Sequence, residues 1–313
     1  MPEEDAMIRV LTGSNEYRIK QELRAAKAQF VTEYGDFGCE DFTAPEASYD
    51  KLLESVQAMP FLADKRQVVI TGVAGNKELI ANMSEFLKQI NEQTDVILVE
   101  PKFDKRSSAY KTLKKLSGFN EYSELDEQGL VRWLGEEVKE QDGSITSSDA
   151  RYLVGRVGAD QLKLSNELAK LLAYAPHITK ESIDLLTVPA PHSTVFELLD
   201  AAFSGQTRKV LTLYEEQRRQ KVEPQEILGL LVWQLHVLAV VKAAGTAMDS
   251  DIASRAKINP YVVRKTRGLV RGISPGSIRQ LTRQVLELDV RLKSESIDAD
   301  AAMQNLLIGI SNT

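Results

Sequence analysis

The turn that begins at Gly13 is the first place where this chain could do chemistry, because a glycine turn between a strand and a helix often binds nucleotide phosphates. Such a loop reads G-x-x-x-x-G-K-[ST]. Its lysine neutralises the phosphate charge, and its serine or threonine hydroxyl binds Mg²⁺. Here the last three positions carry Arg18, Ile19 and Lys20. Ile19 lies in the apolar stripe of the expected helix and should point inward. The strand within 68–72 also ends without a metal-binding acid. ATP hydrolysis is therefore disfavoured, and no cofactor is expected.

Acid–base, nucleophilic and metal chemistry have little support in the sequence. His177, His192 and His236 lie in separate helical or linker contexts, without a nucleophile motif. His236 falls in an apolar helix, which is typical of a core histidine rather than a catalyst. Carboxylates and histidines show no metal-ligand spacing, and Cys39 is the only cysteine, which excludes an intramolecular disulfide and a cysteine-based zinc site. We expect no catalytic residue and no metal site.

Arginines form two rows that could contact phosphate. Arg264, Arg267 and Arg271 follow i, i+3, i+7 spacing, and Arg279 and Arg283 follow i, i+4 spacing on the next expected helix. One-sided rows suit phosphate contact, because each charge must face the nucleic-acid backbone and release counterions. The same rows suit a solvated helix face or an arginine-rich subunit interface. The sequence predicts a DNA or subunit contact and leaves these alternatives open.

The segment 55–70 is a candidate protein-binding element. Its helix should end before Pro60, which cannot continue a helix, and a buried β-branched strand should follow at 68–71. Between them lie Phe61 and Leu62, where a connecting loop would normally be polar. A Phe-Leu pair after a rigid proline could fill an apolar pocket on another protein. From spacing alone, the favoured alternative is that both side chains fold back onto their own core.

The elements that position these residues alternate between strand and helix over the first third of the chain. The periodicity predicts strands at 8–12, 39–43, 68–71 and 96–99, and helices at 16–34, 47–58, 77–90 and 107–116. This order indicates a mostly parallel sheet with helices on both faces. The first helix should bury one apolar stripe, formed by Ile19, Leu23, Ala26 and Phe30.

After about Leu125 the strand signals stop, and the rest of the chain is expected to be helical. Helices are predicted at 129–141, 147–157 (capped by Ser147 or Ser148), 158–174 and after Thr179, followed by an extended proline linker at 188–192. From Ser193 onward helices should be broken at 205, 245, 259–260 and 274–276. The expected domains are therefore 1–125, an α/β domain, 126–189, a small helical domain, and 190–313, a helical domain.

Composition and charge place the chain among soluble globular proteins. It is 43% hydrophobic and 27% charged, and its 313 residues suggest about two domains, or three if some are small helical units. The net charge of −6 argues against a general nucleic-acid binder, although residues 251–293 hold ten basic residues against three acids. The apolar run 227–241 is shorter than the ~20 residues that span a bilayer, and the acidic start lacks a signal peptide. We expect a cytoplasmic protein with no membrane partner.

Several short patterns resemble the delta subunits of bacterial DNA polymerase III clamp loaders. The most specific is Gln57-Ala58-Met59-Pro60-Phe61-Leu62, followed by Lys65, Arg66 and a hydrophobic strand, which looks like that family's clamp-binding element. Weaker patterns occur in the family's order at 11–17, 166–171, 178–183, 195–201, 259–265 and 288–293. Together these patterns extend along most of the chain, and their joint occurrence in this order is specific.

The resemblance implies a degenerate AAA+-like domain without a nucleotide site, a small helical lid-like domain and a C-terminal collar domain. It implies that the chain binds and opens the sliding clamp (the beta subunit) for loading onto primed DNA during replication. Partner subunits in a hetero-oligomeric ring would hydrolyse ATP. The clamp-binding residues implied are Gln57, Met59, Pro60, Phe61 and Leu62. The alternatives are an ATP-hydrolysing AAA+ loader subunit, which would need the missing phosphate loop, and a helical DNA-binding adaptor.

Overall fold

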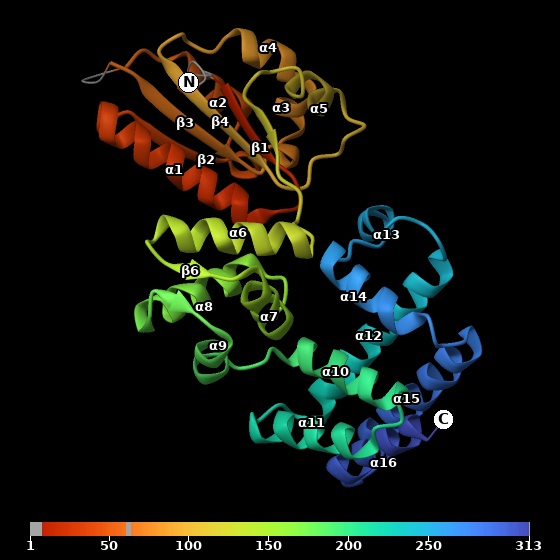
Figure 1. Ribbon diagram of the computed structural model, residues 1–313. Coiled ribbons are helices and arrows are strands. Elements are labelled where there is room, and N and C mark those ends of the chain that lie inside the picture. Colours follow the sequence, from red (N-terminus) through yellow and green to blue (C-terminus); the bar gives the residue numbers. More distant parts are fainter. Residues whose placement is uncertain (1–7, 61–63, 313) are drawn as a thin grey trace. The chain divides into compact units, whose positions relative to one another are not determined.

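A computed structural model describes residues 8–60 and 64–312, and the chain divides into two compact units, Met1–Glu124 and Leu125–Thr313. The first unit contains a five-stranded sheet in the order β2-β3-β4-β1-β5, and the strands that pair in it run parallel (Figure 1). Its strands are β1 (Ile8–Thr12), β2 (Cys39–Thr43), β3 (Arg66–Thr71), β4 (Thr94–Glu100) and β5 (Phe119–Glu121). Its helices are α1 (Glu16–Tyr34), α2 (Tyr49–Gln57), α3 (Lys77–Ala81), α4 (Met83–Lys88) and α5 (Ser108–Leu113), with 3-10 turns at Ala44–Glu46 and Val73–Gly75.

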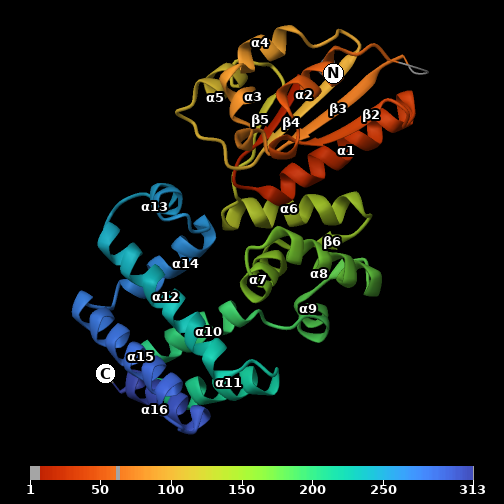
Figure 2. The same ribbon diagram turned by 180° about the vertical axis from the view of Figure 1, so that it is seen from behind.

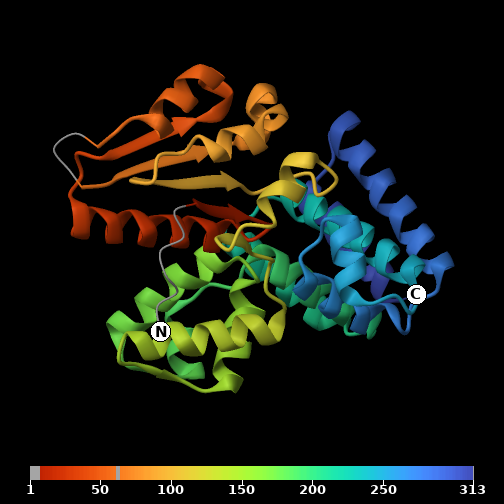
Figure 3. The same cartoon turned by 90° about the horizontal axis from the view of Figure 1, so that it is seen from above.

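The sheet separates two apolar layers, as the alternation of side chains along a strand requires. Helix α1 covers one face, where Ile19 and Phe30 are buried, and α2 to α5 cover the other (Figure 3). Neighbouring residues of β3 divide between the layers: Val69 packs with the α1 side, while Val68 and Ile70 pack with the opposite core. The predicted α/β class and the apolar stripe of α1 are confirmed.

Two sequence predictions for this unit were incomplete. The single helix expected at 77–90 is two helices, because Asn82 leaves helical geometry and its side-chain amide donates to the Glu78 carbonyl. Strand β5 was missed. It has three residues and pairs with β1 through Val10 and Phe119, so its pairing partner lies far away in the sequence.

The second unit is helical. Its helices are α6 (Glu127–Glu140), α7 (Ser147–Val157), α8 (Gln161–Tyr174), α9 (Lys180–Leu186), α10 (Pro191–Phe203), α11 (Thr207–Arg219), α12 (Pro224–Ala244), α13 (Asp249–Ala256), α14 (Pro260–Val270), α15 (Pro275–Ser294) and α16 (Ala299–Ser311). Two short strands, β6 (Ser144–Ile145) and β7 (His177–Ile178), pair in parallel. Strand structure therefore does not stop completely after residue 125. The predicted all-α class of this region holds for everything else in it.

Local corrections concern helix ends. Thr146, rather than Ser147 or Ser148, caps α7 by accepting a hydrogen bond from the Asp149 amide. The helix expected at 158–174 begins at Gln161, after the capping residue Asp160. Pro191 opens α10 instead of extending the linker, which agrees with the preference for proline in the first helical turn. The division of the helical region at residue 189 remains a prediction.

Helix α12 forms the centre of the C-terminal helices (Figure 2). By length and composition this helix could cross a membrane, but the core helix of a soluble protein can meet the same two criteria. Its buried residues Leu231, Leu235 and Leu238 belong to a core shared with α10, α14, α15 and α16. This packing accounts for part of its apolar sequence, while Val232 and Trp233 are 48% and 36% exposed.

Candidate functional site

The junction between α2 and β3 carries the predicted clamp-binding residues. The backbone of Ala58 leaves α2 with φ −63° and ψ 138°, and its amide still donates to the Glu54 carbonyl at 3.0 Å. The chain is thus already extended at Ala58, one residue before Met59, the position that Pro60 disfavours for the helical region. The predicted end of this helix is confirmed.

The described residues of this junction differ in exposure. Met59 is 77% exposed. Gln57 is also exposed, and its amide donates to Gln89 Oε1 at 2.8 Å. Pro60 is half-buried. Phe61 and Leu62 lie outside the described residues, so their assignment as a plug rather than core residues stays a prediction.

Ion pairs and hydrogen bonds fix both sides of the junction to the sheet. Arg66, at the start of β3, pairs with Glu40 of β2 at 2.9 Å, and the other oxygen of Glu40 accepts from Ser55 of α2 at 2.6 Å. The ammonium of Lys65 lies 5.4 Å from the ring centre of Tyr34. The end of α2 and the start of β3 are therefore held together through one carboxylate.

The turn after β1 is filled by the chain itself. Gly13 has φ 116°, and a Cβ there would lie 2.0 Å from the Tyr122 carbonyl oxygen, so only glycine fits. That carbonyl accepts a hydrogen bond from the backbone amide of Asn15 at 3.0 Å. The side-chain oxygen of Asn15 caps α1 by accepting from the backbone amide of Arg18, also at 3.0 Å. Backbone groups that would face a phosphate thus bond within the chain.

Two of the three residues at the missing phosphate-loop positions, Arg18 and Ile19, have other structural roles. Ile19 is 2% exposed within the α1 core, which confirms its inward direction. Arg18 pairs with Glu22 at 2.8 Å. Lys20 is exposed.

The sequence reading missed a buried carboxylate at the carboxyl end of β4. Glu100 is 8% exposed and accepts from the backbone amides of Ala74 at 2.7 Å and Lys102 at 3.2 Å. Its own carbonyl accepts from the Thr12 hydroxyl at 2.6 Å. Because both carboxylate oxygens accept backbone N–H groups, Glu100 fastens the loops at this sheet edge. No group of histidine, cysteine or carboxylate side chains that could hold a metal occurs within 8–60 and 64–312.

The first predicted arginine row does not act as one surface. Arg267 pairs with Asp249 at 2.6 Å and donates to the carbonyls of Gly245 and Ala247, so its guanidinium is engaged within the chain. Arg264 lies 3.8 Å from Glu127 and remains about half exposed, whereas Arg271 is exposed. The predicted contact to DNA or a subunit is therefore weakened for Arg267 and remains a prediction for the other two.

The basic tract also contains a half-buried lysine. The ammonium of Lys265 lies 4.4 Å from the ring centre of Phe196 on α10, and burial lowers the pKa of this lysine. Burial also raises the pKa of its neighbour Tyr261 to about 12. Lys265 thus contributes to α10–α14 packing rather than to a solvent-facing charge row. Arg279 and Arg283, on α15, are exposed.

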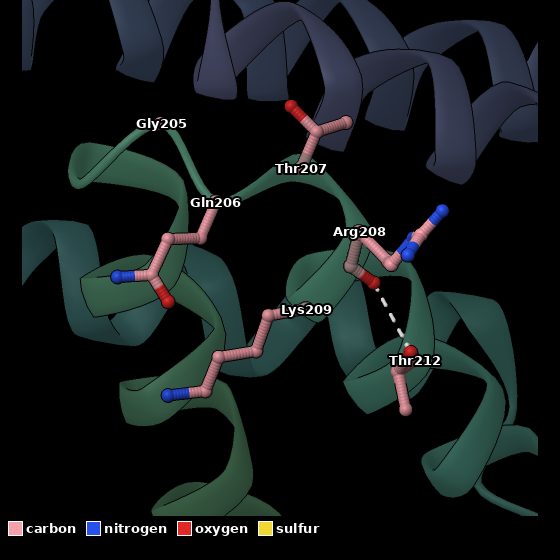
Figure 4. A pocket seen from close by; sticks show the side chains of 6 residues that line it. All are labelled: Gly205, Gln206, Thr207, Arg208, Lys209 and Thr212. Carbon is pink, nitrogen blue, oxygen red and sulfur yellow. Dashed lines mark hydrogen bonds between the residues drawn. The ribbon is translucent and has the colours of Figure 1, made fainter.

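A shallow surface hollow lies at the start of α11 (Figure 4). It is lined by Gly205, Gln206, Thr207, Arg208, Lys209 and Thr212. The Thr212 hydroxyl donates to the Arg208 carbonyl at 3.1 Å, and the side chains of Arg208 and Lys209 extend in different directions. These two cations do not converge on a common point, so the hollow is not assigned a ligand.

Comparison with known proteins gives matches in both units. The profile described as "DNA polymerase III, delta subunit" matches residues 10–123, and that of the "DNA polymerase III delta subunit, C-terminal domain" matches residues 192–310. The chain belongs to the DNA polymerase III delta-subunit family. The family resemblance predicted from the sequence is confirmed.

Individual relatives of this delta-family chain agree with the profiles. The curated DNA polymerase III subunit delta of Bacillus subtilis (strain 168) is 22% identical over 315 residues, covering 95% of this chain and 91% of the relative. The solved structure of the Bacillus subtilis DNA clamp loader delta protein is 21% identical and has a TM-score of 0.80, covering 98% of this chain and 95% of that one. At this identity the structural match establishes a shared fold.

One exposed aromatic residue near the junction between α2 and β3 was not predicted from the sequence. Phe37 is 84% exposed, in a turn closed by a 3.2 Å hydrogen bond from the Cys39 amide to the Asp36 carbonyl. The next residue, Gly38, accepts from the Gln67 amide of β3 at 2.8 Å. Phe37 therefore lies at the amino end of the sheet, the end from which β3 begins. An aromatic residue between two glycines was the available sequence signal.

Proposed function

We propose that this chain is the clamp-loader subunit that binds and opens the sliding clamp, so that the clamp can be loaded onto primed DNA during replication. The observation that carries the proposal is the delta-family match in both units, over residues 10–123 and 192–310. The proposed partners are the sliding clamp, the other loader subunits in a hetero-oligomeric ring, and primed DNA within that complex. The proposed site of action is the cytoplasm.

The proposed clamp-binding residues are Gln57, Met59, Pro60, Phe61 and Leu62. The described part of this segment supports the role through an exposed Met59 and a junction fixed by Glu40. A fixed junction lowers the ordering cost of binding. Phe61 and Leu62 should carry most of the affinity, because buried aromatic and aliphatic anchors commonly dominate an interface.

The test is the double variant Phe61→Ala/Leu62→Ala, measured for clamp affinity and for melting temperature. Losing about 3 kcal/mol of interface energy would weaken binding roughly 150-fold. The matched control is Leu162→Ala/Leu185→Ala, which truncates two exposed leucines elsewhere. Weak clamp binding with an unchanged melting temperature supports the proposal. Intact clamp binding with a melting temperature several degrees lower would show that Phe61 and Leu62 are core residues.

We also propose that the chain does not hydrolyse ATP and that partner subunits do. Support comes from the intrachain hydrogen bonds of Asn15, the buried Ile19 and the Arg18–Glu22 ion pair at the former phosphate-loop positions. Titration of the isolated chain with a fluorescent ATP analogue should show no saturable binding. Micromolar binding that depends on Mg²⁺ would contradict this proposal while leaving clamp binding untouched.

The domain assignment is part of the same proposal. Residues 1–125 would form the AAA+-like clamp-binding domain, 126–189 the small lid-like domain and 190–313 the collar that joins the ring. The first boundary lies beside the junction of the two compact units at Glu124 and Leu125. The collar role of the C-terminal region is supported by the family profile at residues 192–310.

A further inference from the structure

Helix α15 presents two separate faces. One face, with Ile278, Leu281, Val285 and Leu288, is buried in the core of the helical unit. These residues recur every three or four positions, as expected for a helix that packs along one side. One packed face would account for the fold of α15 without any further apolar residue.

The opposite side of α15 carries a second row, Arg279, Arg283, Leu286 and Val290, which we call the α15 seam. Leu286 is 59% exposed and Val290 is 53% exposed, and both arginines are exposed as well. The steps along the row are four, three and four residues, so the side chains fall on one narrow strip of a 3.6-residue helix. Alternating steps of three and four are the spacing by which two helices pack side by side.

The apolar half of the α15 seam favours a protein partner over DNA. Phosphate contact gains nothing from Leu286 and Val290, because affinity for a nucleic-acid backbone comes from charge. Burial of both side chains against another helix would instead remove apolar surface from water. A row that combines two arginines with two aliphatic residues therefore fits an amphipathic helix with acidic residues at one end.

The arginines of the seam have charge available for such a partner. Across 8–60 and 64–312, neither Arg279 nor Arg283 forms an ion pair. Two acids adjoin the apolar end: Asp289 is paired with Lys293 at 2.7 Å, whereas Glu287, exposed and four residues after Arg283, forms no ion pair among the described residues. By contrast, Arg291, off the seam, pairs with Glu295 at 3.2 Å. Among the described residues of α15, Arg291 and Asp289 beside the seam are thus ion-paired, whereas Arg279 and Arg283 on it are not.

We propose that the α15 seam docks an amphipathic helix of a neighbouring loader subunit, with carboxylates opposite Arg279 and Arg283 and aliphatic side chains opposite Leu286 and Val290. This inference rests on the proposed loader function and specifies which face of the C-terminal region makes the contact. It assigns Arg279 and Arg283 to a subunit contact. The dark-blue helix that carries the seam lies at the edge of the helical unit (Figure 3).

The experiment uses the full chain and the ATPase subunits of the loader from the same organism. Two seam variants are compared, Leu286→Ser/Val290→Ser and Arg279→Glu/Arg283→Glu. Each has a control pair of exposed residues of the same chemical class, aliphatic or cationic: Leu162→Ser/Leu185→Ser and Arg208→Glu/Lys209→Glu, respectively. Affinity for the ATPase subunits is measured by titration, and affinity for the clamp is measured in parallel as a check on folding.

Each seam variant should bind the ATPase subunits at least about tenfold more weakly, while each control stays within about twofold and clamp binding is unchanged. If a serine variant loses clamp binding as well, the milder Leu286→Ala/Val290→Ala replaces it. Wild-type affinity in both seam variants would overturn the α15 seam and leave the loader function standing.

Three further outcomes would also overturn the inference. If the arginine variant lost only affinity for primed DNA, with a reduced salt dependence, the row would be a nucleic-acid contact. If the isolated chain formed a dimer that the serine variant abolished, the occupant would be a second copy. If the unaltered chain failed to bind the ATPase subunits, the proposed assembly would fail, and the seam with it.

Discussion

The guanidinium of Arg267 closes the chain reversal between α12 and α13. It bonds the Asp249 carboxylate and the carbonyls of Gly245 and Ala247, and its side chain is 26% exposed. Arg267→Ala should lower the free energy of unfolding of the helical unit by about 2 kcal/mol, as expected when hydrogen bonds to a charged group are lost. Urea denaturation followed by circular dichroism measures this change.

The control for Arg267 is its exposed neighbour on the predicted row. Arg271→Ala should change stability by no more than about 0.5 kcal/mol, because a surface arginine away from such contacts contributes little. Equal stability of the two variants would show that Arg267 is not a structural residue and would return it to the candidate DNA contacts.

A second residue-scale prediction concerns the contact between α11 and α16. Hydrogen bonds from Arg218 at 2.8 Å and from the buried Tyr214 at 2.7 Å hold the pKa of Asp300 below its usual value. A carboxyl with a lowered folded-state pKa stabilises the protein above its unfolded pKa of about 3.9 and loses that contribution as pH falls through the folded value. Asp300→Asn should therefore flatten the pH dependence of stability below about pH 4.

The measurement for Asp300 is urea unfolding of the helical unit at a series of pH values from neutral to acidic. The comparison variant is Asp289→Asn, whose carboxylate forms the exposed i, i+4 pair with Lys293. Parallel curves for Asp300→Asn and the unaltered chain in the acidic range would contradict the assigned role.

Two glycines show how elements differ in their tolerance of a side chain. Gly155, inside α7, has no atom within 4 Å of an added Cβ, so Gly155→Ala should stabilise the chain by about 0.5–1 kcal/mol. A Cβ added at Gly143 would lie 2.5 Å from Leu172 Cδ2 and 2.9 Å from the Pro176 carbonyl oxygen, so Gly143→Ala should destabilise the chain. Opposite shifts in the thermal midpoint are expected. Shifts of the same sign would be inconsistent with the packing around one of these glycines.

Elements with strong local signals could be predicted from the sequence, and those fixed by distant partners could not. The bounds of β1, α1 and β2 follow from periodicity and caps within the segment itself. Strand β5 depends on pairing with β1, more than a hundred residues earlier. Arginine spacing correctly gave the exposed face of α15 with Arg279 and Arg283, but it could not reveal that Asp249 engages Arg267 or that Leu286 is exposed beside Arg283. The candidate clamp-binding residues came from resemblance, since spacing alone favoured a core role for Phe61.

At the scale of the whole molecule, clamp binding and assembly should be separable because each unit has its own core. The sheet of Met1–Glu124 is covered by its own helices, and helices α10 to α16 of the second unit share a separate apolar cluster. Units with independent cores commonly fold alone. A fragment of residues 1–124 should therefore stay folded and bind the clamp within about threefold of the full chain, since it retains the whole junction between α2 and β3.

The same fragment should fail to enter the loader complex, whereas residues 125–313 should enter it without binding the clamp. Size-exclusion chromatography with the ATPase subunits and titration with the clamp measure the two properties on the same preparations. The control is an equimolar mixture of the two fragments, which should bind both partners without co-eluting as the full chain does. Loader entry by residues 1–124 would place an assembly contact on the α/β unit. Loss of clamp binding from a well-folded fragment of residues 1–124 would mean that the helical unit contributes to the clamp site.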